Sequence, residues 1–268
     1  MCECQNKETE LSLATITAQA GNHEDERGAV ALPIYLSSNY RHPTLKEAIN
    51  FDATKDYTYS RLSTPNRRAV EKTLAKLEGG TAAFAVSSGM AAVQLALSIL
   101  KTGDRLISLD DLYGGDFRYF DYLNRHAGIE FDQWDGGSLA DLTAKLTPKT
   151  RIVWLETPSN PTMKEIDIQA VAAAVHEYDP QIKVIVDNTF YTPIYQRPLL
   201  KGADVVIHSA TKYLSGHNDL LGGAVVVKDE KLAQAYYDYY ITTGDTLDSF
   251  DSWLLLRSLK TLKVRMAQ

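Results

Sequence analysis

The chain has 268 residues, 44% of them hydrophobic, so it can bury a core larger than that of one ordinary compact domain. Its formal net charge of -6 gives no basic footprint for nucleic acid or for an anionic membrane surface. Small polar metabolites remain as the class of partner.

The first residues contain the only two cysteines, Cys2 and Cys4. They are too close for an ordinary disulfide, and no later cysteine completes a metal site, so we interpret them as an incidental pair in a polar tail. No basic and then apolar signal opens the chain, and we expect a cytoplasmic protein. Residues 79–100 are uncharged but contain serines, a threonine, a glutamine and glycines, which indicates a strand, a turn and a buried helix rather than a membrane span.

The first sixty residues differ from the rest of the chain. Pro33, Pro43 and scattered aromatic residues from Tyr35 to Tyr59 indicate an extended arm rather than a core unit. Such arms often reach a neighbouring subunit.

From residue 61 onward, short runs rich in Val, Ile and Leu alternate with segments of helical period. The runs are 82–86, 106–109, 152–155, 184–186, 205–207 and 224–227. Helices are predicted at 67–77, where residues 70, 74 and 77 are apolar, and at 166–178, where Asp167 stands near the start. The alternation predicts an α/β fold with a mainly parallel sheet sandwiched by helices.

The last segment, residues 250–268, has a helical pattern with Trp253, Leu256 and Leu259 on one side. No stop signal comes before the sequence ends, so the helix looks interrupted. We expect the apolar face around Trp253 and Leu256 to lie exposed.

Polar segments directly follow four of the apolar runs. They are SSGM at 87–90, ETPSN at 156–160, Asp187 with Asn188, and HSATK at 208–212. Ligands of an open parallel sheet bind beyond the carboxyl ends of its strands, so these segments are the candidate site. Together they would supply a carboxylate, a lysine, hydroxyls and a helix start at Gly89 with unpaired backbone N–H groups.

This set suits a ligand with a phosphate and a basic ring nitrogen, and pyridoxal phosphate fits each part. Lys212 would form an imine with its aldehyde, and Asp187 would keep its ring nitrogen protonated. Ordinary interpretations compete, since a lysine after a strand is usually a solvated charge and an aspartate there is often a helix cap. The strand-end pattern by itself therefore favours a phosphate-cofactor enzyme over other α/β enzymes by a small margin.

The sequence lacks the motifs of other common classes of α/β enzyme. The sequence has no dinucleotide, P-loop or nucleophile-elbow signature, and its six histidines do not show zinc-protease spacing. His208, His217 and Asp219 form an alternative metal site, although structural histidines are the better interpretation and we expect no metal.

Several motif blocks occur in order along the chain. They are YSR at 59–61, SSGMAA at 87–92, DLYGG at 111–115, ETPSNP at 156–161, VDNTF at 186–190, SATKYLSGH at 209–217 and DSWLLLRSLKTLKVRM at 251–266. From about Ile16 to its end the sequence resembles the pyridoxal-phosphate-dependent Cys/Met-metabolism (trans-sulfuration) family. The resemblance implies an aspartate-aminotransferase-like fold of type I. It also implies an arm at 1–60, a cofactor-binding large domain at 61–249, and at 250–268 the first helix of an otherwise missing C-terminal domain.

The resemblance also implies roles for single residues. Lys212 and Tyr113 would be catalytic, with Lys212 linked to the cofactor and Tyr113 stacked on its ring. The cofactor would be bound by Tyr59, Arg61, Gly89, Met90, Tyr113, Asn160, Asp187, Ser209, Thr211 and Lys212. Tyr59 and Arg61 would come from an adjacent subunit, which implies a dimer at least and, by the family norm, a homotetramer of two dimers.

The implied reaction is γ-replacement on an O-acylhomoserine with cysteine or sulfide, as in cystathionine γ-synthases. A cystathionine γ- or β-lyase is the alternative, and a truncated cofactor-binding fragment without turnover is an alternative of another class. Gly114 and Gly115 stand where methionine γ-lyases are expected to carry a cysteine, which disfavours that subgroup. Thr64-Pro65-Asn66 stands where the family usually has Asn-Pro-Thr, so the two polar residues around the proline are exchanged. The resemblance also implies that the arginine that binds the substrate carboxylate would belong to the missing C-terminal domain.

Overall fold

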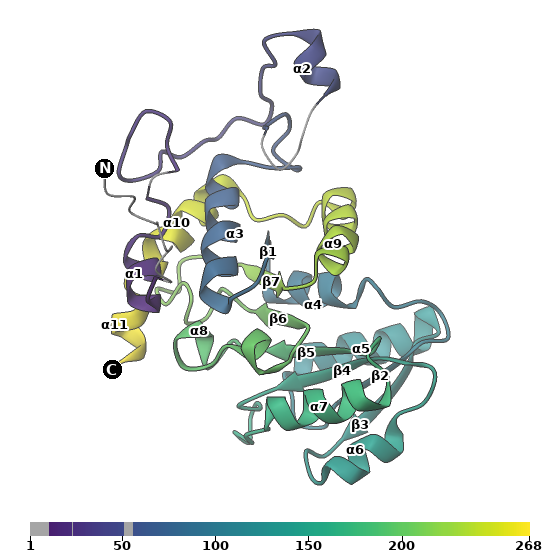
Figure 1. Ribbon diagram of the computed structural model, residues 1–268. Helices are drawn as coiled ribbons and strands as arrows, with labels where there is room; N and C mark the ends of the chain where they lie inside the picture. The colour runs from purple at the N-terminus through teal and green to yellow at the C-terminus, as the bar shows by residue number, and fades with distance from the viewer. Residues whose placement is uncertain (1–10, 23, 51–55) are drawn as a thin grey trace, which may run out of the picture.

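The computed structural model describes residues 11–22, 24–50 and 56–268. Figure 1 shows a twisted central sheet with helices on both faces and an N-terminal segment that extends away from the sheet at α2. Cys2 and Cys4 lie outside the described residues, so their interpretation stays a prediction.

In the described part of the chain, seven strands form one sheet in the order β1-β7-β6-β5-β4-β2-β3. The strands are β1 (Ala82–Val86), β2 (Arg105–Leu109), β3 (Glu130–Trp134), β4 (Thr150–Glu156), β5 (Lys183–Asp187), β6 (Val205–His208) and β7 (Gly223–Val227). Only β7 runs antiparallel to its neighbours, β1 and β6. The six apolar runs are all strands, and the predicted mainly parallel sheet is confirmed.

Helices cover both faces of the sheet, except that α2 extends away from it (Figure 1). They are α1 (Leu13–Ala18), α2 (Leu45–Ile49), α3 (Pro65–Glu78), α4 (Gly89–Leu97), α5 (Gly114–Ala127), α6 (Leu139–Lys145), α7 (Ile168–Tyr178), α8 (Thr192–Tyr195), the 3₁₀ turn η1 (Pro198–Lys201), α9 (Glu230–Thr243), α10 (Ser249–Leu259) and α11 (Leu262–Met266). The side chains of α4, α5 and α9 pack on one face, with Ile185 among them. Those of α3, α6, α7 and α10 pack on the other, with Val184 and Val186. The central strands read as unbroken apolar runs because both faces are buried.

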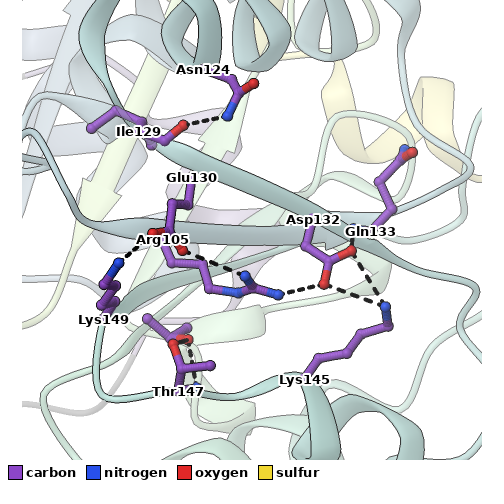
Figure 2. A network of polar contacts seen from close by, with 10 residues as sticks. Arg105, Asn124, Ile129, Glu130, Asp132, Gln133, Lys145, Thr147 and Lys149 are labelled. Carbon is purple, nitrogen blue, oxygen red and sulfur yellow. Dashed lines mark hydrogen bonds and ion pairs between the residues drawn. The ribbon is translucent and has the colours of Figure 1, made fainter.

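Strand β3 was not predicted from the sequence EFDQW. Among the described strands only β2 pairs with it, so it lies at the sheet edge, and three of its five residues, Glu130, Asp132 and Gln133, are polar. Figure 2 shows how its charges are matched: Arg105 lies 3.6 Å from Glu130 and 2.5 Å from Asp132, and Lys149 and Lys145 flank the same two carboxylates. Charged side chains at an edge also discourage pairing with another chain.

The unusual turn before α3 has a clear structural role. Thr64 caps the helix by accepting a hydrogen bond from the backbone N–H of Arg67 at 3.2 Å. The buried Asn66 side chain accepts from the N–H of Tyr35 and donates to the carbonyl of Pro33, both at 2.9 Å. The exchanged polar residues therefore fasten the N-terminal segment to α3.

The expectation of an exposed C-terminal face is wrong. Leu256 is only 4% exposed, and Leu255 and Leu259 are fully buried. Helix α10 packs on α3, while α11 contacts α1, so elements from the other end of the chain cover this face (Figure 1). Trp253 is half-buried beside Phe250. The helical pattern of residues 250–268 does not indicate which element covers their apolar face.

Part of the predicted arm at 1–60 packs against the core. Helix α1 packs on α3, and Ala20 and Leu32 belong to the core, while the domain division at residue 60 stays a prediction. Beyond Pro33 the chain is irregular, and Leu45 and Ile49 of α2 are 77% and 73% exposed. Among the described residues, no helix is long and apolar enough to cross a membrane.

Candidate active site

A cavity of about 190 Å³ lies at the carboxyl ends of β5 and β6, beside the starts of α4 and α5. The predicted residues that line it are Gly89, Met90, Tyr113, Asn160, Asp187, Ser209, Thr211 and Lys212. Ser88, Asp116, Glu156, Thr189 and Phe190 also line it. The polar segments that follow four separate strands thus meet in one place, as strand-end reasoning predicts.

The start of α4 forms one wall. Ser88 caps the helix by accepting from the N–H of Ala91 at 3.0 Å. The first N–H groups of a helix have no partner within it and favour a phosphate. Gly89 brings this end against Ser209, because a Cβ on Gly89 would lie 2.9 Å from both Cβ and Oγ of Ser209. The glycine lets a serine hydroxyl and the helix end face the same small volume.

Replacing Gly89 by alanine is therefore expected to push Ser209 out of place and to weaken cofactor binding about tenfold. Titration of the purified protein with pyridoxal phosphate, followed by absorbance, measures this. Gly114→Ala is the matched control, since its Cβ would meet only Nη1 of Arg118 at 3.7 Å. Wild-type affinity in the Gly89→Ala protein would show that Gly89 is not part of the phosphate site.

Lys212 lies in a hydrogen-bonded turn, residues 210–215, directly after β6. Its backbone N–H donates to the carbonyl of Ser209 at 3.1 Å. The Thr211 hydroxyl donates to the carbonyl of Gly222 at 3.1 Å and accepts from its N–H at 3.0 Å. Thr211 thus ties the turn to the segment before β7, and its role in phosphate binding stays a prediction.

Three carboxyl groups form the floor of the cavity. Asp187 ends β5, Glu156 is its neighbour in register on β4, and Asp116 lies in the first turn of α5. One oxygen from each lies within 4.8 Å of the others. The N–H of Thr189 donates to Asp187 at 2.9 Å, whereas Oδ2 of the buried Asp116 has no partner among the described residues.

These acids sit in an electrostatically costly position. Burial, with the charge of Asp187 as the next cause, raises the pKa of Glu156 to about 9. Burial likewise raises the pKa values of Asp116 and Asp187. A cation beside these three carboxyl groups would offset the repulsion between their negative charges. The protonated ring nitrogen of a bound cofactor is such a cation. Asp116 was missed from sequence and Glu156 was given no role, although both lie within or next to the quoted motifs.

Tyr113 and Asn160 are each held by a carboxylate. The backbone N–H of Tyr113 donates to Oε2 of Glu156 at 2.7 Å, and its ring is 47% exposed at the cavity. Asp111 accepts from the hydroxyls of Ser159 and Thr162 on either side of Asn160, and from the N–H of Thr162 at 3.2 Å. These contacts fix the loop from which Asn160 reaches the cavity.

Tyr59 and Arg61 do not line this cavity. The Arg61 guanidinium contacts the carbonyl of Ile241 and lies 5.6 Å from the centre of the Tyr59 ring. Within one chain they do not complete the site, and the expectation that they serve an adjacent subunit stays a prediction.

The structure does not bring the residues of the alternative metal site, His208, His217 and Asp219, together. His208 is fully buried and its Nε2 lies 2.7 Å from Oε1 of Glu78. His217 instead contacts the carbonyl of Ser215 at 2.5 Å and the hydroxyl of Ser258 at 3.2 Å. Among the described residues, the one group with ligand spacing is Asp116, Glu156 and Asp187.

The family model described as Cys/Met metabolism PLP-dependent enzyme matches residues 14–268. The chain belongs to this family. Its members are enzymes of sulfur amino-acid metabolism that depend on pyridoxal phosphate, so the resemblance seen in the motifs, the type I fold and the cofactor are confirmed. The donor set described above fits that cofactor: unpaired helix N–H groups for the phosphate, carboxylates for the ring nitrogen and a lysine.

Named relatives include both synthases and lyases. A cystathionine γ-synthase/O-acetylhomoserine (thiol)-lyase of Bacillus subtilis is 48% identical over 98% of this chain and 67% of its own. A cystathionine β-lyase of Lactococcus lactis is 41% identical over 95% of this chain and 65% of its own. The crystal structure of a cystathionine γ-lyase from Lactobacillus plantarum complexed with L-serine matches with a TM-score of 0.88 and 38% identity. The match covers 95% of this chain and 65% of that one. The chain spans about two thirds of the length of these relatives.

Proposed function

We propose that the protein catalyses γ-replacement on an O-acylhomoserine with cysteine or sulfide. The observation that carries the proposal is the meeting of Lys212, Asp187 and the start of α4 in one cavity. The 48% identity to a protein named cystathionine γ-synthase/O-acetylhomoserine (thiol)-lyase supports this reaction over its alternatives.

The cofactor, when bound, withdraws electrons from the carbon that carries the substrate amino group. Asp187 would hold the ring nitrogen protonated, and one oxygen each of the buried Asp116 and Glu156 lies within 4.8 Å of an Asp187 oxygen. The N–H groups at Gly89 and Met90 and the Ser209 hydroxyl would hold the phosphate. Tyr113 would cover the ring, because its backbone is fixed by Glu156 and its side chain lies at the cavity.

Lys212 acts as the base of the reaction. Its amine would remove the proton from the α-carbon of the substrate. Replacement at the γ-carbon requires a second proton removal, from the β-carbon, and the Lys212 amine would be the movable base there after it has given up the first proton. Tyr113, on the same cavity, assists proton transfer.

The assembled protein has sites shared between subunits. Tyr59 and Arg61 lie outside their own cavity, and Leu45 and Ile49 expose apolar surface on the extended segment beyond Pro33. A second copy would bring Tyr59 and Arg61 to the phosphate, where the arginine fork suits its oxygens. The expected assembly is a homotetramer of two such dimers in the cytoplasm.

Product analysis tests the reaction. The purified protein with pyridoxal phosphate, O-acetylhomoserine and cysteine is expected to form cystathionine, and with cystathionine alone to release little ammonia or oxo acid. Ammonia and an oxo acid from cystathionine, without the synthase product, would assign a lyase. Cofactor binding without any of these products would assign a non-catalytic cofactor-binding fragment.

A further inference from the structure

The turn that carries Lys212 ends in carbonyls that its own backbone leaves open. Within residues 210–216 the N–H of Ser215 donates to the carbonyl of Ala210 at 3.0 Å, and that of Gly216 to Lys212 at 2.7 Å. Among the described residues, no backbone hydrogen bond is made to the following two carbonyls, those of Tyr213 and Leu214. Carbonyls at such an end need a partner from outside it.

Arg265 of α11 supplies that partner. Its Nη1 donates to the carbonyl of Tyr213 at 2.6 Å and its Nη2 to that of Leu214 at 3.2 Å. Nη2 also donates to the carbonyl of Ser258 at 3.0 Å, and Nε to Oγ1 of Thr261 at 3.0 Å. All three nitrogens of the guanidinium are thus engaged. A planar fork with several donors can bridge two adjacent carbonyls and a second helix, which a lysine ammonium does less well.

Gly216 makes room for this contact. Its φ of +66° lies in the left-handed region, and a Cβ there would come within 1.9 Å of Nη1 of Arg265. The glycine in the motif SATKYLSGH is therefore explained by an arginine far along the sequence. Sequence spacing gives no sign of this pairing.

Two further contacts attach α10 and α11 to the segments around the Lys212 turn. The hydroxyl of Ser258 in α10 lies 3.2 Å from Nδ1 of His217, just after the turn. The hydroxyl of Tyr195 in α8 donates to the carbonyl of Met266, and α8 packs on α11. The C-terminal helices are thus attached to the wall of the candidate site at several points.

We propose that Arg265 is a positioning residue that clamps the Lys212 turn to α10 and α11. It fixes the backbone of Lys212, and through it the direction from which the amine enters the cavity. The functional meaning of the clamp rests on the proposed role of Lys212. A further consequence is that any movement of α10 and α11 is transmitted to the lysine through two backbone carbonyls.

Hydrogen exchange of the cofactor-free chain tests the clamp itself. Arg265→Gln is expected to speed exchange at the amides of Ser215 and Gly216 at least tenfold. Arg265→Lys, which keeps the charge but loses the fork, should lie between it and the wild type. Lys263→Gln is the matched control, since Lys263 is an exposed residue of the same helix. Unchanged protection in Arg265→Gln and Arg265→Lys would overturn the clamp.

Reductive trapping tests its effect on the lysine. With pyridoxal phosphate bound, borohydride fixes the cofactor on the lysine that holds it, and peptide mapping measures the fraction on Lys212. We expect Arg265→Gln to need about tenfold more cofactor for half-maximal trapping, with unchanged circular dichroism. Faster exchange with wild-type trapping would overturn the positioning role. If the wild type itself traps no cofactor on Lys212, the proposed function fails while the exchange result still decides the clamp.

Discussion

Replacing Lys212 by alanine is expected to abolish the visible absorbance that a lysine-linked pyridoxal phosphate gives, and to lower turnover by about 10³-fold or more. Lys212 is the one lysine that lines the cavity within the described part of the chain. No neighbouring amine there can form the imine in its place or act as the base. Absorbance titration and product analysis on the same preparation measure both effects.

Two further variants separate this role from an effect of charge. Lys212→Arg keeps a positive charge in the turn but cannot form the imine, so it should behave like the alanine variant. Lys228 also directly follows a strand, β7, but is exposed and outside the cavity. Lys228→Ala should keep the absorbance. Retention of the band in Lys212→Ala would assign the cofactor to another lysine.

The acidic floor makes the stability of the cofactor-free protein depend on pH. The pKa of Glu156 is raised from 4.5 to about 9, chiefly by burial. Between these values the folded protein holds a proton that the unfolded chain releases. The contribution to stability is therefore complete below about pH 4.5 and is lost as the pH rises toward 9.

Glu156→Gln should remove the part of this dependence that comes from Glu156. The variant keeps an oxygen that can accept from the N–H of Tyr113 but cannot ionise. At pH 8 the cofactor-free variant is expected to be more stable than the wild type by on the order of 3 kcal/mol, with little difference below pH 5. Urea unfolding at several pH values measures the difference. Glu177→Gln, at an exposed position on α7, is the control, and parallel pH curves for wild type and Glu156→Gln would contradict the assignment.

Much of the sheet could be predicted because its central strands are buried on both faces. Burial on both faces leaves unbroken runs such as 184–186 and 224–227, which stand out from the helical segments around them. Edge strand β3 could not be predicted in this way because Glu130, Asp132 and Gln133 interrupt its apolar residues. The cover over Leu256 could not be predicted, since α1 and α3 approach it through tertiary packing alone.

The candidate site shows the same division. Lys212, Asp187, Gly89 and Asn160 follow strands, and parallel topology gathers strand ends without any knowledge of side-chain contacts. Asp116 reaches the floor from a helix, so strand-end reasoning passed over it. Arg265 is harder still to predict from the sequence, because its contact with the Lys212 turn depends on how α11 packs against that turn. Local pattern thus predicted what the sheet itself positions and missed what the helices bring to it.

The pairing of β1 with β7 has a consequence for synthesis on the ribosome. Strand β1 lies at the sheet edge, where β7 is its one partner among the described strands, with Ala82 opposite Val227; its other side meets only the isolated bridge from Val86 to Thr246. At translation rates of about 5–20 residues per second, the partner of this apolar strand emerges on the order of ten seconds later. During that interval the nascent chain carries AAFAV without its partner. Residues 82–86 are therefore where a chaperone that holds extended apolar segments would find its longest-lived target.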